Sequence, residues 1–236
     1  MPFVPVLHAE WLKIRTLRSL VGSLAAILLV TVGFSAVAAA DPDHSDALFS
    51  AFFGVSLGQI AAVSFGAMAV AGEYRDGALR LTLAAVPDRT RWFAAKATAV
   101  ALPMLAVGLL TGLLTLGLGR INLGADAPTW SEGLRGAVGC ALYLTLMALL
   151  AAGLAAVLRS GVTTLALLIP FLLIVSFVIG DLSAGAADYL PDRAGQVALH
   201  STWDGALGPW TGLAVTALWT AAALLAGAWC VRRRDA

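Results

Sequence analysis

The chain has 236 residues, of which 60% are hydrophobic and only 12% are charged, whereas charged residues make up about 25% of a soluble domain. The formal net charge of +1 gives no overall attraction to nucleic acid. Composition and charge therefore argue against a soluble domain and a nucleic-acid-binding protein, and they predict a protein whose solvent is the lipid bilayer.

Six stretches of the sequence are apolar over the length that a membrane-spanning helix needs, about 20 residues for about 30 Å of hydrocarbon. They are continuously apolar and do not alternate, which favours helices over the strands of a barrel. The predicted spans are residues 19–40, 49–72, 95–118, 136–158, 161–180 and 210–231. We therefore expect an all-α integral membrane protein with six transmembrane helices, forming a single transmembrane domain over residues 1–236.

Lysine and arginine concentrate on one side of these spans. Most of the 15 basic residues precede the first span, join the second span to the third, or follow the last one. Because the basic residues of short loops stay on the cytoplasmic side, both termini are expected in the cytoplasm.

The segment before the first span combines apolar residues at helical spacing with charged residues. The apolar positions are Val4, Leu7, Trp11 and Ile14. This pattern predicts a helix that lies on the inner leaflet, with Trp11, Lys13 and Arg15 at the interface between lipid and water. A basic anchor that only fixes the orientation is the alternative. A cleaved signal peptide is disfavoured, because the apolar run that follows is longer than the about 7–15 residues of a signal sequence.

The loop between the first two spans is acidic, with Asp41, Asp43 and Asp46 around His44. These side chains could bind a divalent cation, which prefers oxygen ligands. A solvated acidic loop that enforces the topology is the favoured interpretation, so no metal site is expected.

The connection between the second and third spans, residues 73–93, is the longest of the predicted cytoplasmic segments. It mixes basic and apolar residues, and Pro87 divides it. The part before the proline, residues 74–85, can form a short amphipathic helix, and the residues that follow form a turn before the third span begins near Lys96.

Motifs for catalysis are weak or lacking. The only lysines, Lys13 and Lys96, do not follow a glycine, so the chain has no G-x-x-x-x-G-K-[ST] phosphate loop. Residues 54–58 match the G-x-S-x-G turn that exposes a serine nucleophile, which makes an intramembrane serine protease one alternative. The three histidines lie outside the apolar spans, however, so Ser56 has no expected base. The interiors of the spans also lack the ionisable residues of ion-coupled transporters, which favours movement driven from outside the membrane.

Residues 72–87, with the sequence GEYRDGALRLTLAAVP, resemble the segment after the second helix of ABC-2 type permeases. That family typically shows a Glu-Tyr-Arg-x-Gly stretch, a short apolar helix and a Pro-basic turn before a lysine of the third span. Residues 10–15 and 233–236 agree with it, and the order of elements agrees over nearly the whole chain. Asp76 and Asp88 depart from the family pattern, which can alter the choice of partner without removing docking.

The resemblance implies a permease subunit that pairs with a second permease copy, or a homologous one, and binds two cytoplasmic ABC ATPase subunits. The segment after the second span would be the coupling helix that docks on the ATPase. The resemblance assigns this role to Glu73, Tyr74, Arg75, Gly77, Leu79 and Arg80. The chain would then be no enzyme and would bind no cofactor, with ATP and Mg²⁺ held by the partner ATPase.

The alanine-rich composition, with arginine favoured over lysine, resembles that of actinobacterial permeases. It implies a location in a bacterial plasma membrane, and export is the expected direction of transport. The alternative from another class is a membrane protein that transports nothing, such as a scaffold or an immunity protein.

Overall fold

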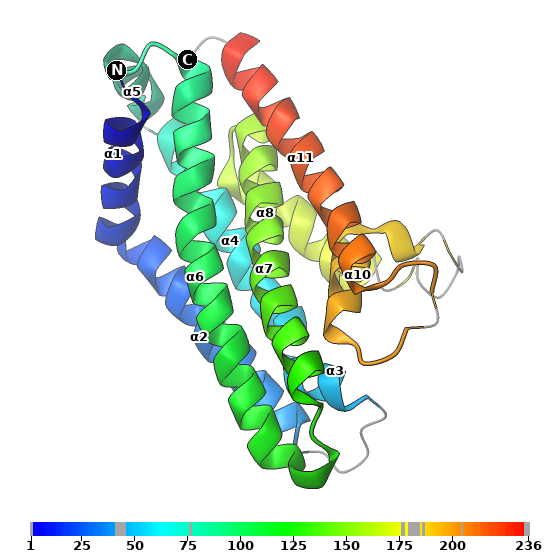
Figure 1. Ribbon diagram of the computed structural model, residues 1–236. Helices are drawn as coiled ribbons and strands as arrows, with labels where there is room; N and C mark the ends of the chain where they lie inside the picture. The colour runs from blue at the N-terminus through cyan, green and yellow to red at the C-terminus, as the bar shows by residue number, and fades with distance from the viewer. Residues whose placement is uncertain are drawn as a thin grey trace.

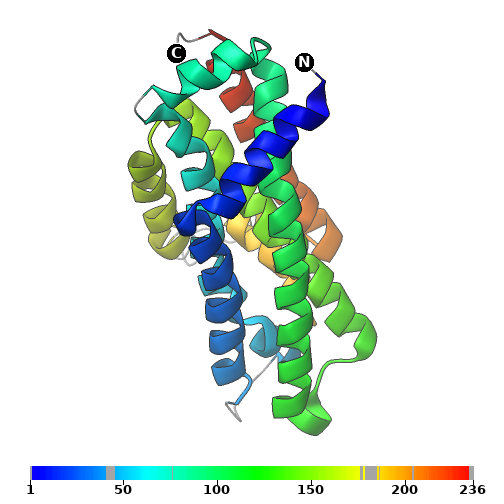
Figure 2. The same ribbon diagram turned by 90° about the vertical axis from the view of Figure 1, so that its left-hand side faces the viewer.

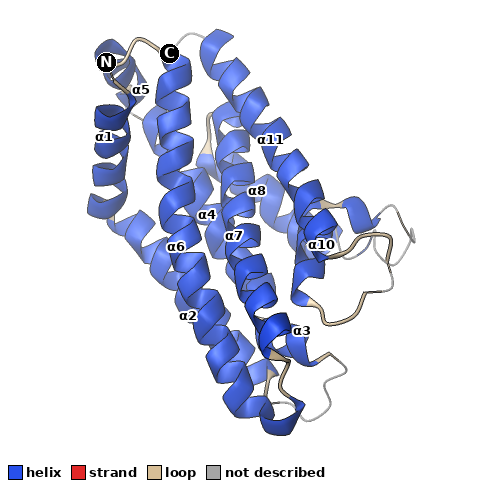
Figure 3. Ribbon diagram, in the orientation of Figure 1, coloured by secondary structure: helices blue, strands red, loops and turns tan. Residues whose placement is uncertain are grey.

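The computed structural model describes residues 2–40, 46–75, 77–175, 178, 185, 187–203 and 205–233. Over these ranges the chain is all-α, with helices joined by loops (Figure 3). Three residues of the predicted acidic loop, Asp41, Asp43 and His44, lie outside the described residues, as does Asp76 of the predicted coupling segment.

Five helical stretches are long and apolar enough to cross a membrane, so the expectation of a multi-pass membrane protein is met at this coarser level. They are α2 (Arg18–Ala38), α3 (Ala47–Phe52) with α4 (Val55–Ala71) and η1 (Gly72–Tyr74), α6 (Arg89–Leu123) with η2 (Gly124–Asp126), α7 (Trp130–Leu158) and α11 (Pro209–Arg233). They correspond to the first four predicted spans and the last one.

The fifth predicted span, residues 161–180, is described only in part. Its helix α8 (Gly161–Pro170) continues as a π-helical turn, η3 (Phe171–Val175). The change of helix type follows Pro170, whose ring and missing N–H disturb the regular hydrogen-bond ladder. The described part of this segment is shorter than a membrane-spanning helix needs, so a total of six spans stays a prediction.

The centre of the bundle is α7, which packs against α4, α6 and α11. Small residues allow this close approach. A Cβ atom at Gly108 would lie 3.0 Å from Cα of Ala141, and one at Gly112 would lie 2.7 Å from the carbonyl oxygen of Ala137. Gly108 and Gly112, four residues apart on α6, therefore pack inside the bundle, where lipid offers no hydrophobic drive and close packing supplies the attraction.

Gly66 of α4 lies directly against α7, since a Cβ atom there would lie 1.9 Å from the carbonyl oxygen of Ala148. We expect Gly66→Ala to push the two helices apart and lower the free energy of unfolding by about 1–3 kcal/mol. Gly22 of α2 has open space at the same position. Gly22→Ala is therefore the matched control and should be neutral or slightly stabilising, because alanine favours helix by about 1 kcal/mol over glycine. Thermal unfolding in detergent measures both, and equal melting temperatures would contradict the packing.

The first and last described residues lie at the same end of the bundle, together with the short helix α5 (Ala78–Ala85) (Figure 1). We call this the termini end. Helix α1 (Phe3–Thr16) crosses the outside of α6 near it (Figure 2). Farther from the termini, η4 (Ala187–Tyr189), α10 (Pro191–Gln196) and η5 (Val197–Leu199) pack beside α11.

Candidate functional site

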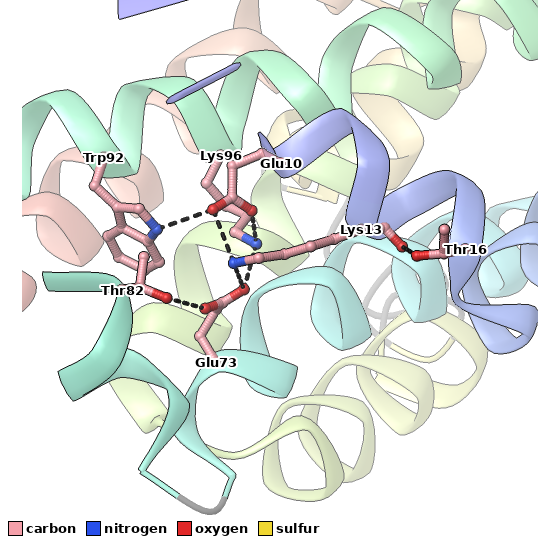
Figure 4. A network of polar contacts seen from close by, with 7 residues as sticks. All are labelled: Glu10, Lys13, Thr16, Glu73, Thr82, Trp92 and Lys96. Atoms are coloured by element: carbon pink, nitrogen blue, oxygen red, sulfur yellow. Dashed lines mark hydrogen bonds and ion pairs between the residues drawn. The ribbon is translucent and has the colours of Figure 1, made fainter. Parts of the chain in front are cut away.

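Four charged side chains meet near the termini end, and we call them the ion cluster: Glu10, Lys13, Glu73 and Lys96 (Figure 4). Oε1 of Glu73 accepts hydrogen bonds from Nζ of Lys96 at 2.7 Å and from Nζ of Lys13 at 2.8 Å. Glu10 pairs with both lysines as well, at 3.0 Å from Lys13. The cluster therefore joins α1, η1 and α6.

The ion cluster is largely shielded from solvent. Glu10, Glu73 and Lys96 are only 2%, 5% and 3% exposed. A buried charge is costly unless a partner compensates it, and here two carboxylates face two ammonium groups, so the formal charges cancel. Loss of the buried cation Lys96 would therefore leave the two carboxylates with an excess buried charge.

Neutral donors add further hydrogen bonds to the two carboxylates. The indole Nε1 of Trp92 donates to Oε1 of Glu10 at 3.2 Å, and the hydroxyl of Thr82 donates to Oε2 of Glu73 at 3.2 Å. Trp92 lies one turn before Lys96 on α6, and Thr82 belongs to α5 (Figure 4). Helix α5 is therefore attached to the same cluster.

Lys13 is the member of the cluster nearest to solvent, with 37% of its side chain exposed. Burial alone would lower its pKa, but the hydrogen bonds and charges of Glu73 and Glu10 outweigh this effect and raise the pKa above its usual range. Lys13 therefore stays charged at neutral pH and holds α1 against η1.

Helix α5 is a short amphipathic helix that follows a tight turn. Gly77 precedes it with φ of 73°, a left-handed conformation that glycine adopts without strain. Leu79 is buried, whereas Arg80 is exposed and Leu81 is 76% exposed. The helix thus presents a large apolar side chain at the surface of the termini end.

Tyr74 links the same region to the end of α7. Its hydroxyl donates to the carbonyl oxygen of Ala156 at 3.4 Å, and the guanidinium of Arg159 lies 5.7 Å from the centre of its ring. Cation–π contacts of this kind contribute about 0.5–1 kcal/mol at exposed sites. The segment that leads into α5 is therefore held by α7 as well as by α1 and α6.

The residues assigned to the coupling segment fall into two groups. Glu73 and Leu79 are buried and Tyr74 is half-buried, whereas Arg75, Gly77 and Arg80 are exposed. Glu73 contacts Lys13 of the predicted interfacial helix, so the structure brings together two segments that are 60 residues apart.

The predicted interfacial helix is present as α1, but it turns a different face to the bundle. Its buried residues are Val6, Glu10 and Ile14, while Val4 of the predicted apolar stripe is exposed. Of the assigned interfacial residues, Trp11 and Lys13 are half-buried and Arg15 is exposed. The difference arises because Glu10 points inward to Lys96 and Trp92, which an apolar periodicity cannot indicate.

Four residues of the site were not assigned from the sequence: Glu10, Thr82, Trp92 and Lys96. One feature of the sequence could have indicated a pair between Glu10 and Lys96. Glu10 and Lys96 both lie outside or at the edge of apolar runs that the distribution of basic residues places on one side of the membrane. Opposite charges on one side of a small bundle are candidates for pairing, but the partner cannot be chosen without the fold.

Ser56 of the G-x-S-x-G match has an amide partner: its hydroxyl donates to Oε1 of Gln196 at 3.0 Å. The flanking glycines pack α4 on α2. A Cβ atom at Gly54 would lie 2.0 Å from the carbonyl oxygen of Thr31, and one at Gly58 would lie 2.0 Å from the hydroxyl oxygen of the same residue. The motif residues therefore have a packing role.

Comparisons with known proteins identify no family or relative of this chain. No protein-family model matches the chain, and no curated protein matches it significantly. The comparisons therefore show no family for this protein.

Proposed function

We propose that this chain is the membrane-spanning permease subunit of an ATP-driven ABC-2 type transporter. In this proposal it has six spans, with both termini in the cytoplasm of a bacterium, and the termini end faces the cytoplasm from the plasma membrane. The transporter works as an exporter. The order of the apolar helices, the distribution of basic residues and the resemblance of residues 72–87 support this reading.

The observation that carries the proposal is the attachment of α5. The helix exposes Arg80 and Leu81 at the termini end, while the residues on either side of it, Glu73 and Lys96, are locked to each other inside the bundle. An exposed leucine on a short helix, with basic residues around it, suits a groove on a soluble partner. The partner in this proposal is an ABC ATPase subunit.

This arrangement explains how a docked partner would move the spans. Because Glu73 follows α4 directly and Lys96 lies on α6, a displacement of α5 acts on two long helices at once. The ion cluster adds α1 to the same unit through Glu10 and Lys13. A rigid connection of this kind converts movement of the ATPase into a rigid-body shift of helices.

The complete transporter would hold two ATPase subunits and a second permease, either another copy of this chain or a homologue. ATP and Mg²⁺ would bind to the ATPase subunits, since residues 1–236 contain no phosphate loop. The buried residues Glu73 and Leu79 then position α5, and the exposed residues Arg75, Arg80 and Leu81 contact the partner.

The proposal is tested by purifying the tagged chain from its native host in mild detergent and measuring the ATPase subunit recovered with it. We expect an ATPase with a phosphate loop to copurify. Leu81→Asp should reduce its recovery strongly, since loss of a central contact costs about 2 kcal/mol or more, which is tenfold or more in affinity.

Ile121→Asp is the matched control, because Ile121 is also 76% exposed but lies near the far end of α6. It should leave the recovery of the ATPase unchanged. If the Leu81→Asp variant and the unchanged chain recovered the same amount of ATPase, α5 would be ruled out as the docking site. Repeated absence of any ATPase beside an intact, folded chain would instead favour a membrane protein that transports nothing.

A further inference from the structure

A cavity of about 500 Å³ is lined by residues of α3, α4, η3 and α10, among others. Helices α3 and α10 lie away from the termini end (Figure 1). The size of the cavity falls within the range of about 300–1,000 Å³ that is typical of small-molecule sites. One part of its wall is apolar, formed by Phe49, Leu57, Leu172 and Leu173. This wall suits the hydrophobic body of a ligand.

The other part of the wall is a preorganised hydrogen-bond network. The hydroxyl of Ser56 donates to Gln196, whose amide donates to the hydroxyl of Tyr143 at 3.2 Å. Tyr143 donates in turn to Gln59, and the amide of Gln59 donates back to the carbonyl oxygen of Ser56 at 2.9 Å. The network fixes the two glutamines, and each carboxamide nitrogen carries a second hydrogen.

Close packing holds α10 in place at this network. A Cβ atom at Gly195 would lie 2.3 Å from the ring of Tyr143, and one at Gly212 of α11 would lie 2.1 Å from the carbonyl oxygen of Ala194. The polar side of the cavity is therefore built on a rigid support, which is what precise recognition of a ligand requires.

The cavity carries an excess of negative charge. Among the described residues that line it, Asp188 and Asp192 are carboxylates and Arg193 is a cation, so with His200 counted as neutral these residues carry a net charge of −1. Asp192 is only 5% exposed. A carboxylate that is shielded from water, as Asp192 is, attracts a cation more strongly than one that is fully solvated.

We propose that this cavity binds a small amphiphilic organic cation, with its apolar body against Leu57 and Leu172 and its positive charge toward Asp188 and Asp192. The inference goes beyond the proposed transport function and does not depend on it, because binding to the cavity needs no ATPase. A failure to bind the cation would not count against docking of an ATPase at α5. Absence of an ATPase would likewise not count against binding of a cation in the cavity.

The test uses ethidium, a flat aromatic cation, and fluorescence polarisation with the full chain purified in detergent. We expect saturable binding. Asp192→Asn, which keeps the shape of the side chain, should weaken it about tenfold or more, the loss expected for one desolvated charge contact. Leu57→Trp fills the apolar side of the cavity and should weaken binding of any occupant. Asp188→Asn provides a second charge variant if Asp192→Asn does not fold.

Two controls separate charge recognition from general partitioning into the protein. Asp126→Asn removes an exposed carboxylate of η2 that does not line the cavity, and it should leave the affinity unchanged. Phenanthridine, the neutral ring system of ethidium, should bind more weakly to the unchanged chain and should be insensitive to Asp192→Asn. Absence of ethidium binding, or equal affinity in folded Asp192→Asn and Leu57→Trp variants, would overturn the proposal.

Discussion

Lys96→Ala is expected to lower the free energy of unfolding by about 3–5 kcal/mol, the loss measured when one partner of a buried ion pair is removed. Lys96 contacts both Glu10 and Glu73 and is only 3% exposed. Its removal leaves two buried carboxylates facing Lys13 alone, so the cluster carries an excess negative charge. Thermal unfolding of the purified chain in detergent, compared with the unchanged protein, measures the effect.

Lys13→Ala is the control within the same cluster. Lys13 also contacts both carboxylates, but its partial exposure lets water replace it, so the expected loss is about 1 kcal/mol. Adding Glu10→Gln to Lys96→Ala should recover part of the stability, because it removes the excess charge. If Lys13→Ala destabilised the chain as much as Lys96→Ala does, burial would not be the reason for the effect.

The long helices could be predicted from the sequence because a helix that crosses a membrane needs an apolar run of sufficient length, and such runs are visible in the sequence. Their ends could not be predicted so well, because local caps determine them. Helix α6 begins at Arg89, before the expected residue 95, because the Asp88 side chain accepts the N–H of Arg91 at 3.0 Å. Helix α7 begins at Trp130 because Thr129 and Glu132 form a capping box.

The candidate site could be predicted only in outline. A short amphipathic helix was expected over residues 74–85, and the structure places one at Ala78–Ala85. It begins later than expected because Gly77 adopts a left-handed conformation just before it. The pairing of Lys13 with Glu73 depends on how α1 crosses α6, which no local pattern records. A charged residue near an apolar run is ordinarily solvated, so Glu10 gave no sign that it would be buried.

Asp46, at the other end of the bundle, also has tertiary contacts that the sequence did not indicate. The sequence predicts that it belongs to an acidic loop that enforces topology, and in the structure its side chain also caps α3, accepting hydrogen bonds from the N–H groups of Leu48 and Phe49 at 3.0 and 3.1 Å. It also accepts the hydroxyl of Ser201 at 2.7 Å and lies 3.1 Å from Nδ1 of His200. One carboxylate therefore joins the start of the second span to the segment before the last one.

Asp46→Ala should consequently lower the free energy of unfolding by about 3 kcal/mol, since several charge-assisted hydrogen bonds are lost together. Asp126→Ala, which removes an exposed aspartate of η2, is the control and should cost little. Thermal unfolding in detergent at pH 7 distinguishes the two. Similar melting temperatures for both variants would mean that the Asp46 contacts do not stabilise the fold.

The contribution of Asp46 should also depend on pH. Partial burial would raise its pKa, but hydrogen bonds from the hydroxyl of Ser201 and from the N–H groups of Phe49 and Ser201 outweigh this and hold the pKa below its usual range. The stabilisation is then complete above the unfolded-state pKa of about 3.9 and is lost as the pH falls below it. As the pH is lowered below about 4, the unchanged chain should therefore lose more stability than Asp46→Asn, which has no carboxylate to protonate. Parallel losses in the two proteins would assign the acid sensitivity to other carboxylates.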